Sequence, residues 1–461
     1  MKLILKDEFA LRGWLNYPHA LVFYPTGEIT ILNDLQFQSL TFCDGITDID
    51  SVYVLNSHRE QIKKYLDKGI VKKCDSNEEI KDYQRYKEYN CQYIKHAHWA
   101  ITRNCNYLCK HCYMSSPGVK HTELSYEQCE RVISQLEKCG ILSVSLTGGE
   151  PLLRTDFLKI INTLIDKKIN LRSVYTNGSL INSKLLDELD KLNIKPAFSI
   201  SFDGLGHHDW LRGIKGAEKA TIKAIKLLHK KGFKIEIEMC LHKNNADTIE
   251  STVDFLAGLG VESIKINQAT ESGEWVKEGT KYSLTVKEVY DLYLDYIPKF
   301  FKKGSPVTLQ LGGFFYCEKN GKIFNIPAVR FSGKESCLSD SVCSHAKNIM
   351  YINPDGQILP CVSLDGMKLN QEKIFITEME LSDALTHSDY LSLINLNLQE
   401  FLSFNKKCNN CEHKLVCGGG CRGLGAMKKG EYFDNDSTAC IFFKNDYLNK
   451  IKKCVSDFVE I

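Results

Sequence analysis

Short apolar runs alternate with longer amphipathic segments between residues 97 and 270. The runs have the length and the β-branched content of buried strands, whereas the segments between them carry apolar residues at helical spacing. Strands that alternate with helices in this way predict a parallel α/β sheet. The six units fall short of the eight that close a barrel, so we expect an open, partial (β/α)6 barrel of the TIM type. The expected strands are 98–103, 142–147, 171–176, 197–202, 234–241 and 262–267.

The pattern differs on both sides of this stretch. Near the N-terminus two β-rich runs around positions 26–27 predict a hairpin, and helices are expected from Asn33 or Asp34 to Gly45 and within 59–71. After about residue 300 the alternation stops, and the following Gly-, Asn-, Asp- and Cys-containing clusters would bury little apolar surface. The expected segments are a first domain at 1–80, a linker at 81–96, the partial barrel at 97–300, a bridging region at 301–336 and a C-terminal domain at 337–461.

The composition is that of an ordinary globular protein. The chain has 461 residues, of which 43% are hydrophobic and 25% are charged. With 59 Lys and Arg against 57 Asp and Glu, the formal charge of +2 gives no electrostatic reason to expect binding to nucleic acid or to an anionic membrane. The sequence has no recognisable signal peptide or apolar membrane span, so we expect a cytoplasmic protein.

The nineteen cysteines are the unusual feature, because clustered cysteines in a reducing cytosol bind metal or do redox chemistry more often than they form disulfides. Residues 105–112 read CNYLCKHC and follow the first expected strand, so they lie at the carboxyl end of the sheet, where ligands bind. Cys105, Cys109 and Cys112 could hold an iron–sulfur cluster with one iron left open. The alternatives are incidental thiols, or a zinc site with His111 as its fourth ligand.

CNYLCKHC resembles the CxxxCxxC loop of radical S-adenosylmethionine (SAM) enzymes. In that family three cysteines bind a [4Fe–4S] cluster, and SAM chelates the open iron through its amino and carboxylate groups. One electron cleaves SAM to methionine and a 5′-deoxyadenosyl radical, which abstracts a hydrogen atom from the substrate. The resemblance implies an enzyme, a radical SAM oxidoreductase, with Cys105, Cys109 and Cys112 as cluster ligands.

Three further segments support this resemblance, each at the end of an expected strand. LTGGEPLLR (146–154) is similar to the family's GGE segment, which contacts the SAM amino group, and YTNG (175–178) ends the next strand. SISFDGLGHHDWLRG (199–213) contains residues similar to the family's Ser and DxxRG elements. The resemblance implies SAM-binding roles for Gly148, Gly149, Glu150, Asn177, Ser201 at the ribose hydroxyls and Arg212 at the carboxylate.

The C-terminal cysteines form a second pattern. Cys337 and Cys343 are followed by Gly356 and Cys361, and five more cysteines lie between positions 408 and 440. On spacing alone, eight thiols could fill two zinc sites. The order resembles the SPASM domain of some radical SAM enzymes, which holds two auxiliary [4Fe–4S] clusters and would bring the total to three. Some relatives leave the iron at the Cys337 position open for substrate sulfur. The resemblance assigns Cys337, Cys343, Cys361 and Cys421 to the first auxiliary cluster and Cys408, Cys411, Cys417 and Cys440 to the second.

The first domain resembles a third known module. Residues 9–45, FALRGWLNYPHALVFYPTGEITILNDLQFQSLTFCDG, are similar to the PqqD-like peptide-recognition element of ribosomal peptide maturases. That element is a small winged-helix fold with a three-stranded sheet, and it binds a leader peptide as an added strand. The alternative is a structural cap on the barrel.

The combination of modules resembles maturases of the sactisynthase and ranthipeptide synthase type, which modify a ribosomally made precursor peptide. We expect a thioether between a peptide cysteine and a carbon atom of a second residue. Carbon–carbon cross-linking and epimerisation are the alternatives. Cys317 is the candidate catalytic thiol, and Cys317 or Cys240 could donate a hydrogen atom in an epimerisation. An electron donor such as flavodoxin or ferredoxin is the second expected partner.

Two other interpretations compete with this one. Anaerobic sulfatase maturases share the layout but usually carry an Asp directly after the cysteine that corresponds to Cys361, whereas Val362 stands here and Asp365 follows three positions later. The remote alternative is a non-catalytic zinc protein whose winged helix binds nucleic acid, against which the near-neutral charge argues.

Overall fold

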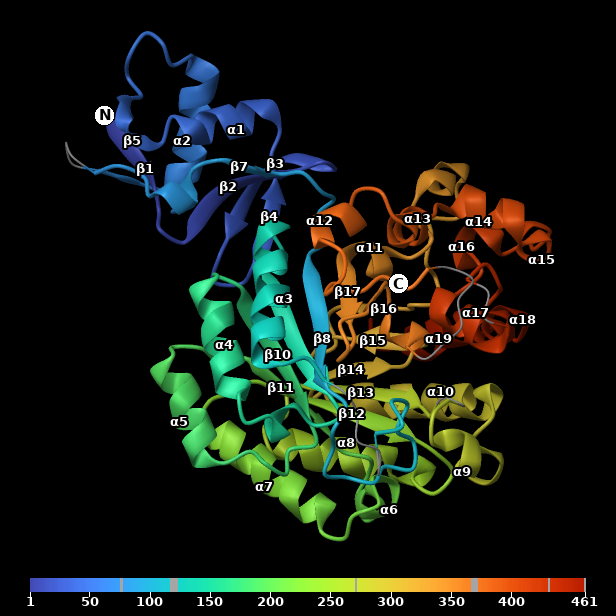
Figure 1. Ribbon diagram of the computed structural model, residues 1–461. Coiled ribbons are helices and arrows are strands. Elements are labelled where there is room, and N and C mark those ends of the chain that lie inside the picture. The colour runs from blue at the N-terminus through green and yellow to red at the C-terminus, as the bar shows by residue number, and fades with distance from the viewer. Residues whose placement is uncertain (75–77, 117–122, 270–271, 366–371, 430–431, 460–461) are drawn as a thin grey trace.

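The computed structural model describes residues 1–461 apart from 75–77, 117–122, 270–271, 366–371, 430–431 and 460–461. Figure 1 shows an N-terminal module in blue, a large central sheet with helices on its outer face, and a C-terminal region in orange and red at the other side of the sheet. The sheet has eleven strands in the order β16-β15-β14-β13-β12-β11-β10-β9-β8-β17-β18. Within these described ranges no helix is both long and apolar enough to cross a bilayer.

The six strands expected from the sequence pattern are confirmed, and they run parallel as β8 to β13. β14 continues the parallel order beyond β13, and β17 pairs in parallel with β8 at the other side, so the sheet is an open, partial barrel. The bounds are β8 His96–Thr102, β9 Ser143–Gly148, β10 Asn170–Thr176, β11 Ala197–Ser201, β12 Ile235–Leu241, β13 Ser263–Gln268, β14 Thr308–Leu311 and β17 Ile349–Ile352. The remaining strands, β15 Phe315–Cys317, β16 Phe324–Asn325 and β18 Ile358–Leu359, are antiparallel to their neighbours.

Helices cover the outer face of the sheet, and the alternation along each strand explains why (Figure 1). In β12 the residues Ile235, Ile237 and Met239 are buried in the main core, whereas Glu238 and Cys240 between and after them are half-buried on the opposite, concave face. An apolar outer face requires a helical cover, and a polar concave face can line a site. The covering helices are α3 Tyr126–Lys138, α4 Phe157–Asp166, α5 Ser183–Lys191, α7 Ala217–Lys230, α8 Ile249–Gly258 and α10 Val286–Lys302.

The N-terminal module contains the predicted hairpin, in which β3 and β4 are joined at Gly27, whose φ is 69°. The first helix begins after its capping residue Asn33, as predicted, but it ends at Thr41 because the chain then turns into β5. The module has two small sheets, ordered β4-β3-β2-β7 and β5-β1-β6, where the resemblance implied one sheet of three strands. The bounds are β1 Lys2–Leu5, β2 Phe9–Trp14, β3 Tyr17–Phe23, β4 Glu28–Ile31, β5 Asp44–Asp48, β6 Val71–Lys73, β7 Lys87–Tyr89, α1 Asp34–Thr41 and α2 Asn56–Asp67.

The module is packed firmly onto the amino end of the barrel. Trp14 is buried in the main core, and its indole Nε1 donates to the Cys139 carbonyl at 2.9 Å. Asn170 Nδ2 donates to the Pro25 carbonyl at 2.6 Å. The connecting segment takes part as well, because β7 pairs in parallel with β2. One side of the module therefore belongs to the main core, whereas residues such as Leu3 and Leu40 form a second core within the module.

The C-terminal region is built from short helices around a small core of its own. That core contains Cys337 and Cys408 beside Phe401, and Cys343 and Cys361 pack against it. The last helices return to the barrel, where Tyr447 donates to Asp291 of α10 at 2.6 Å. The helices include α11 Ser344–Asn348, α12 Leu381–Ala384, α13 Asp389–Asn395, α14 Leu398–Phe404, α15 Lys406–Asn409, α16 Lys414–Cys417, α17 Arg422–Lys429, α18 Ser437–Lys444 and α19 Tyr447–Val455.

Candidate functional site

The loop that carries Cys105, Cys109 and Cys112 follows β8 and lies at the carboxyl end of the sheet, as predicted. The Tyr107 N–H points at Cys105 Sγ at 3.5 Å, and the Ser116 N–H points at Cys112 Sγ at 3.5 Å. Burial raises the pKa of the Cys105 thiol to about 12, and the other two thiols are close enough to add to the rise. Backbone N–H donors are thus directed at two of the three sulfurs, which fits thiolates that ligate a cluster.

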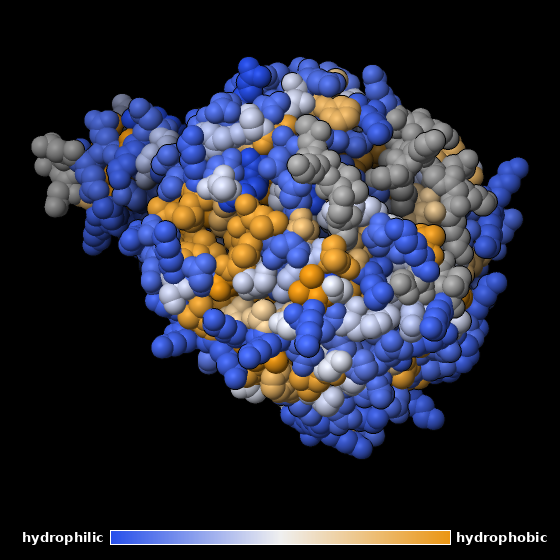
Figure 2. All heavy atoms as spheres, turned by 60° about the horizontal axis from the view of Figure 1, so that its bottom comes forward, coloured by the Kyte–Doolittle hydropathy of each residue, from blue (hydrophilic) through white to orange (hydrophobic). Residues whose placement is uncertain are grey.

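Neighbouring loops clamp the cysteine loop from two sides. The backbone N–H of Leu108 donates to the Arg212 carbonyl at 3.2 Å, and the Glu274 N–H donates to the Cys112 carbonyl at 3.0 Å. Figure 2 views the molecule from this side and shows apolar side chains gathered on that face. Leu108 and Leu153, at this end of the sheet, are 54% and 39% exposed.

The Gly148–Gly149 pair fits directly against the start of the cysteine loop. Gly149 N donates to the Thr102 carbonyl at 2.8 Å, and Glu150 N donates to the Asn104 carbonyl at 2.8 Å. A Cβ on Gly149 would lie 2.4 Å from the Asn104 carbonyl oxygen. The glycines are thus required for backbone contact between two loops, a role that is separate from the expected contact with SAM.

Glu150 is fully buried and joins the ends of β9 and β10. Its carboxylate accepts hydrogen bonds from Thr176 Oγ1 at 2.8 Å and from the Asn177 N–H at 2.8 Å. Burial raises the pKa of Glu150 to about 7, against the opposing effect of these donors. Asn177 Nδ2 in turn donates to Asn106 Oδ1 of the cysteine loop at 2.9 Å. The two predicted site residues therefore lie together, bonded to each other and to the loop.

Arg212 lies at the end of α6 His208–Arg212 and is held by a buried carboxylate. Its Nε and Nη2 donate to Asp203 Oδ2 at 2.7 Å and Oδ1 at 3.1 Å, and its Nη1 points at Cys109 Sγ at 3.8 Å. Asp203 also accepts from the Cys240 N–H at 3.0 Å and lies 3.0 Å from His208 Nδ1. Burial opposes ionisation of Asp203, but Arg212 and His208 hold its pKa well below the usual range. By pairing with Arg212, Asp203 thereby holds the positive charge of that guanidinium in place beside the cysteine loop.

Of the other predicted residues, Ser201 and Cys240 lie on strands at the site, whereas Cys317 does not. Ser201 ends β11 half-buried, and no hydrogen bond from the described part of the chain occupies its hydroxyl. Cys240 is the penultimate residue of β12 and lies on the concave face, where burial raises the pKa of its thiol and the nearby Asp203 and Cys109 add to the rise. Cys317 is buried in the main core opposite Leu309, near the amino ends of the parallel strands, and its thiol donates to the Glu318 carbonyl at 3.4 Å. The structure thus brings Cys240, and not Cys317, to the cysteine loop.

The concave face of the sheet carries polar side chains that the motifs did not indicate. The His98 ring lies 4.7 Å from the Tyr175 ring and 5.7 Å from the Tyr351 ring. Glu238 and Lys265 form an ion pair at 3.5 Å. Burial lowers the pKa of His98 to about 4, so this ring is neutral near pH 7. These side chains come from five strands and offer a polar lining for a substrate.

The eight C-terminal cysteines gather in the two expected neighbourhoods, with one exception. Burial raises the pKa of Cys361, and Cys421 and Cys343 add to the rise. Burial also raises the pKa of Cys417 to about 12, and Cys440 and Cys408 add to it. Cys337 packs in the same small core, but its thiol donates to the Leu415 carbonyl at 3.6 Å. N–H groups again point at sulfur, from Ser363 to Cys361 at 3.4 Å and from Asn435 to Cys440 at 3.5 Å.

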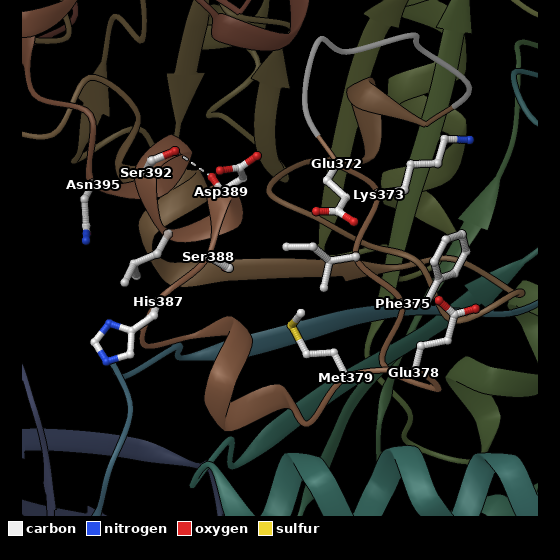
Figure 3. A pocket seen from close by; sticks show the side chains of 12 residues that line it. Glu372, Lys373, Phe375, Glu378, Met379, His387, Ser388, Asp389, Ser392 and Asn395 are labelled. Carbon is white, nitrogen blue, oxygen red and sulfur yellow. Dashed lines mark hydrogen bonds between the residues drawn. The ribbon is translucent and has the colours of Figure 1, made fainter.

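Chemistry could also lie at a single-metal site or in a cavity away from the cysteine loop. In the described ranges no three His, Cys, Asp or Glu side chains converge as a site for a single metal ion. A cavity of about 760 Å³ lies in the C-terminal region, between the 372–379 segment and α13 (Figure 3). Its lining includes Lys373, Glu378 and His387 but none of the predicted site residues. We therefore place the chemistry at the cysteine loop and the concave face.

Comparison with known proteins supports this placement. The sequence model of the Radical SAM superfamily matches residues 99–256. The chain is 24% identical over 354 residues to the AdoMet-dependent heme synthase of Methanosarcina barkeri, across 75% of this chain and 95% of that protein. It is 25% identical over 370 residues to the antilisterial bacteriocin subtilosin biosynthesis protein AlbA of Bacillus subtilis, across 78% of this chain and 73% of that protein.

The fold is similar to that of a solved peptide complex. The crystal structure of Streptococcus suis SuiB bound to its precursor peptide SuiA superposes with a TM-score of 0.64 at 17% identity, across 95% of this chain and 99% of that chain. This likeness extends beyond the matched superfamily region to the N-terminal module and the C-terminal region. With the superfamily match at the cysteine loop and the partial barrel around it, the chain is a radical SAM enzyme.

Proposed function

We propose that this enzyme modifies a ribosomally made precursor peptide and closes a thioether between a peptide cysteine and a carbon atom of a second residue. The support comes from three sides: the superfamily match, the similarity to a bacteriocin biosynthesis protein, and a fold shared over nearly the whole chain with a protein solved with its precursor peptide. The similarity to the heme synthase covers 75% of this chain and that to AlbA covers 78%. The N-terminal module, rather than this coverage, favours a peptide substrate, because an extended peptide can add to a strand edge.

The observation that carries the proposal is the free edge of β4. β4 is the last strand of its sheet, and its side chains are largely exposed. Leu32 N donates to the His19 carbonyl at 2.9 Å, so the neighbouring Ile31 N–H points away from β3. An unpaired strand edge is a liability unless it binds something, and an extended leader peptide can add to it as a further strand.

The chain's own residues would prepare the reaction at the cysteine loop. When bound, the [4Fe–4S] cluster and SAM supply a 5′-deoxyadenosyl radical that removes a hydrogen atom from the peptide. Arg212, fixed by Asp203, presents a positive charge beside Cys109, where a carboxylate of SAM would be attracted. The free Ser201 hydroxyl lies at the carboxyl end of β11 and Gly149 at that of β9, with β10 between them. Glu238 and Lys265 line the face on which the peptide would lie.

Thioether closure needs an electron acceptor, because the product has lost two hydrogen atoms. One hydrogen atom leaves the carbon, the thiol loses a proton, and one electron must leave as the sulfur–carbon bond forms. The two C-terminal cysteine sets would hold the auxiliary [4Fe–4S] clusters that take up this electron. An external carrier such as flavodoxin or ferredoxin would exchange electrons with the protein.

The placement of single residues bears differently on the competing reactions. Asp365 is not free to act as the base of a sulfatase maturase, because it pairs with Arg103 at 3.1 Å and accepts from Asn353 at 3.0 Å. Epimerisation would require a thiol at the radical site, and there Cys240 is the better placed cysteine. Carbon–carbon cross-linking uses the same residues as thioether formation, so mass spectrometry has to separate the two.

The test is to incubate the anaerobically reconstituted enzyme with SAM, a reductant and candidate precursor peptides encoded near its gene. A thioether is expected to remove two hydrogens and to block one cysteine against alkylation. The same mass loss with a free cysteine would indicate a carbon–carbon bond, and deuterium uptake from heavy water without that loss would indicate epimerisation.

The β4 edge has its own test. Ile31→Pro removes the outward N–H, so precursor binding is expected to weaken at least tenfold, whereas Ile31→Ala keeps the N–H and serves as the control. Unchanged binding by Ile31→Pro would favour the structural-cap interpretation of the module.

A further inference from the structure

Arg422 directly follows Cys421 at the start of α17 and is only 1% exposed. Its guanidinium lies over the Phe401 ring, with Cζ 3.9 Å from the ring centroid. Its Nε has no hydrogen-bond partner in the described chain. Nη1 and Nη2 donate to backbone carbonyls alone, namely Gly419 at 2.5 Å, Gly420 at 3.1 Å, Asp434 at 2.9 Å and Tyr432 at 3.4 Å.

No carboxylate in the described part of the chain lies within ion-pairing distance of this guanidinium. Arg212, by comparison, is also buried but is bound by Asp203 through two nitrogens. A buried charge is costly unless an opposite charge compensates it, and backbone carbonyls carry only partial charges. The burial of Arg422 therefore calls for an anion close by.

The two predicted thiolate sets can supply such anions, in addition to the buried Asp436 carboxylate, which accepts from the Cys421 N–H at 3.1 Å. Cys421, one residue away, belongs to the first set, and Cys408 of the second set lies in the same small core as Phe401. Arg422 thus follows a cysteine of the first set directly, and its guanidinium packs on Phe401, which shares a core with a cysteine of the second set.

We propose that Arg422 is the internal counter-charge shared by the two C-terminal clusters and that it raises their reduction potentials. The inference rests on the proposed function, because it takes both cysteine sets to hold iron–sulfur clusters. A cluster bound by thiolates is negatively charged and gains one more negative charge when it accepts an electron. A fixed positive charge in a medium of low dielectric constant stabilises the reduced form more than the oxidised form. Arg422 would thereby favour the uptake of the electron that thioether closure releases.

The test uses the reconstituted full-length protein and compares Arg422→Gln and Arg422→Lys with the wild type. Arg59→Gln is the matched control, because Arg59 also donates to backbone carbonyls, in the N-terminal module. Iron is counted per chain, and the midpoint potentials are followed by EPR-monitored redox titration. We expect Arg422→Gln to keep its iron and to lower both auxiliary potentials, while the potential of the cluster at Cys105, Cys109 and Cys112 stays unchanged. Arg422→Lys and Arg59→Gln are expected to remain near the wild type.

Unchanged auxiliary potentials in an Arg422→Gln protein with full iron would overturn the inference. If Arg422→Gln loses auxiliary iron and Arg422→Lys keeps it, the charge requirement is supported. Loss of iron from both variants would instead assign Arg422 a purely structural role as a clamp on carbonyls. A wild-type protein with only about four irons per chain would refute the auxiliary clusters themselves, and with them this inference.

Discussion

The barrel and the C-terminal region hold their cysteines in different ways. In the barrel the loop of Cys105, Cys109 and Cys112 is laid over a sheet whose continuous apolar core is independent of it. In the C-terminal region Cys337 and Cys408 are members of the small core itself, and Cys343 and Cys361 pack against it. The first arrangement allows a ligand site to be emptied without loss of the fold. The second makes the fold depend on what the thiols bind.

The same contrast appears in how each region places an arginine. Arg212 is compensated by a protein carboxylate and remains balanced whether or not a ligand is present. Arg422 has no carboxylate partner in the described chain, and its charge would be fully compensated only when the two cysteine sets bind their iron–sulfur clusters. The barrel is therefore a preformed site, whereas the C-terminal region becomes complete on loading.

The largest effect is expected when the barrel cysteines are removed together. The triple substitution of Cys105, Cys109 and Cys112 by Ala should abolish SAM cleavage, because it removes every protein ligand of the radical-generating cluster. The auxiliary iron and the thermal unfolding of the barrel should change little. The measurement is 5′-deoxyadenosine production by liquid chromatography. Cys129→Ala, a buried helix position, is the control, and continued production by the triple variant would refute the assignment.

Removal of iron should affect the barrel and the C-terminal region differently. After anaerobic chelation, amide hydrogen exchange is expected to rise strongly within residues 337–461, because the small core loses its cross-links. The strands β8 to β13 should keep their protection. Equal loss of protection in both regions would contradict the contrast, and so would equal retention.

Within the barrel, the buried ion pair is the sensitive point. Asp203→Ala leaves the Arg212 charge buried without its partner, which should destabilise the protein by about 3–5 kcal/mol. Asp187→Ala, which breaks a surface pair with Lys231, should cost less than about 1 kcal/mol. Urea unfolding measures both. Similar losses for the two variants would mean that Asp203 has no special role in holding Arg212.

A smaller, pH-dependent effect is expected from Glu150. Burial raises its pKa from 4.5 to about 7, so between these values the folded state binds a proton that the unfolded state has released. Its contribution to stability is therefore present below about pH 4.5 and is lost as the pH rises toward 7. The loss amounts to at most about 3 kcal/mol. The difference in unfolding free energy between wild type and Glu150→Gln should fall over this interval, and a flat difference would contradict the burial argument.

Much of this architecture was predictable from the sequence because it depends on local patterns. Strand periodicity placed all six central strands, and the capping residue Asn33 marked the start of α1. The cysteine loop was predictable because ligand spacing is a sequence property. The second small sheet of the N-terminal module was missed, since β1, β5 and β6 are short and their pairing is set by tertiary contacts.

The polar network behind the loop was harder to predict. Asp203, His208 and Arg212 lie close in sequence, but their convergence on Cys109 depends on how α6 is placed against the loop. Glu238 and Lys265 come from adjacent strands and meet because of the register between β12 and β13. An acidic or basic residue at a concave position of an otherwise apolar strand is the signal that could have identified them.

The central claim is that the cluster at Cys105, Cys109 and Cys112 has an iron open to SAM. EPR spectroscopy of the reduced protein before and after the addition of SAM tests it most directly. The account predicts that SAM changes the signal of one cluster, and that this change is lost in the triple Cys→Ala variant while the other signals remain. A spectrum that SAM leaves unaltered would contradict the account.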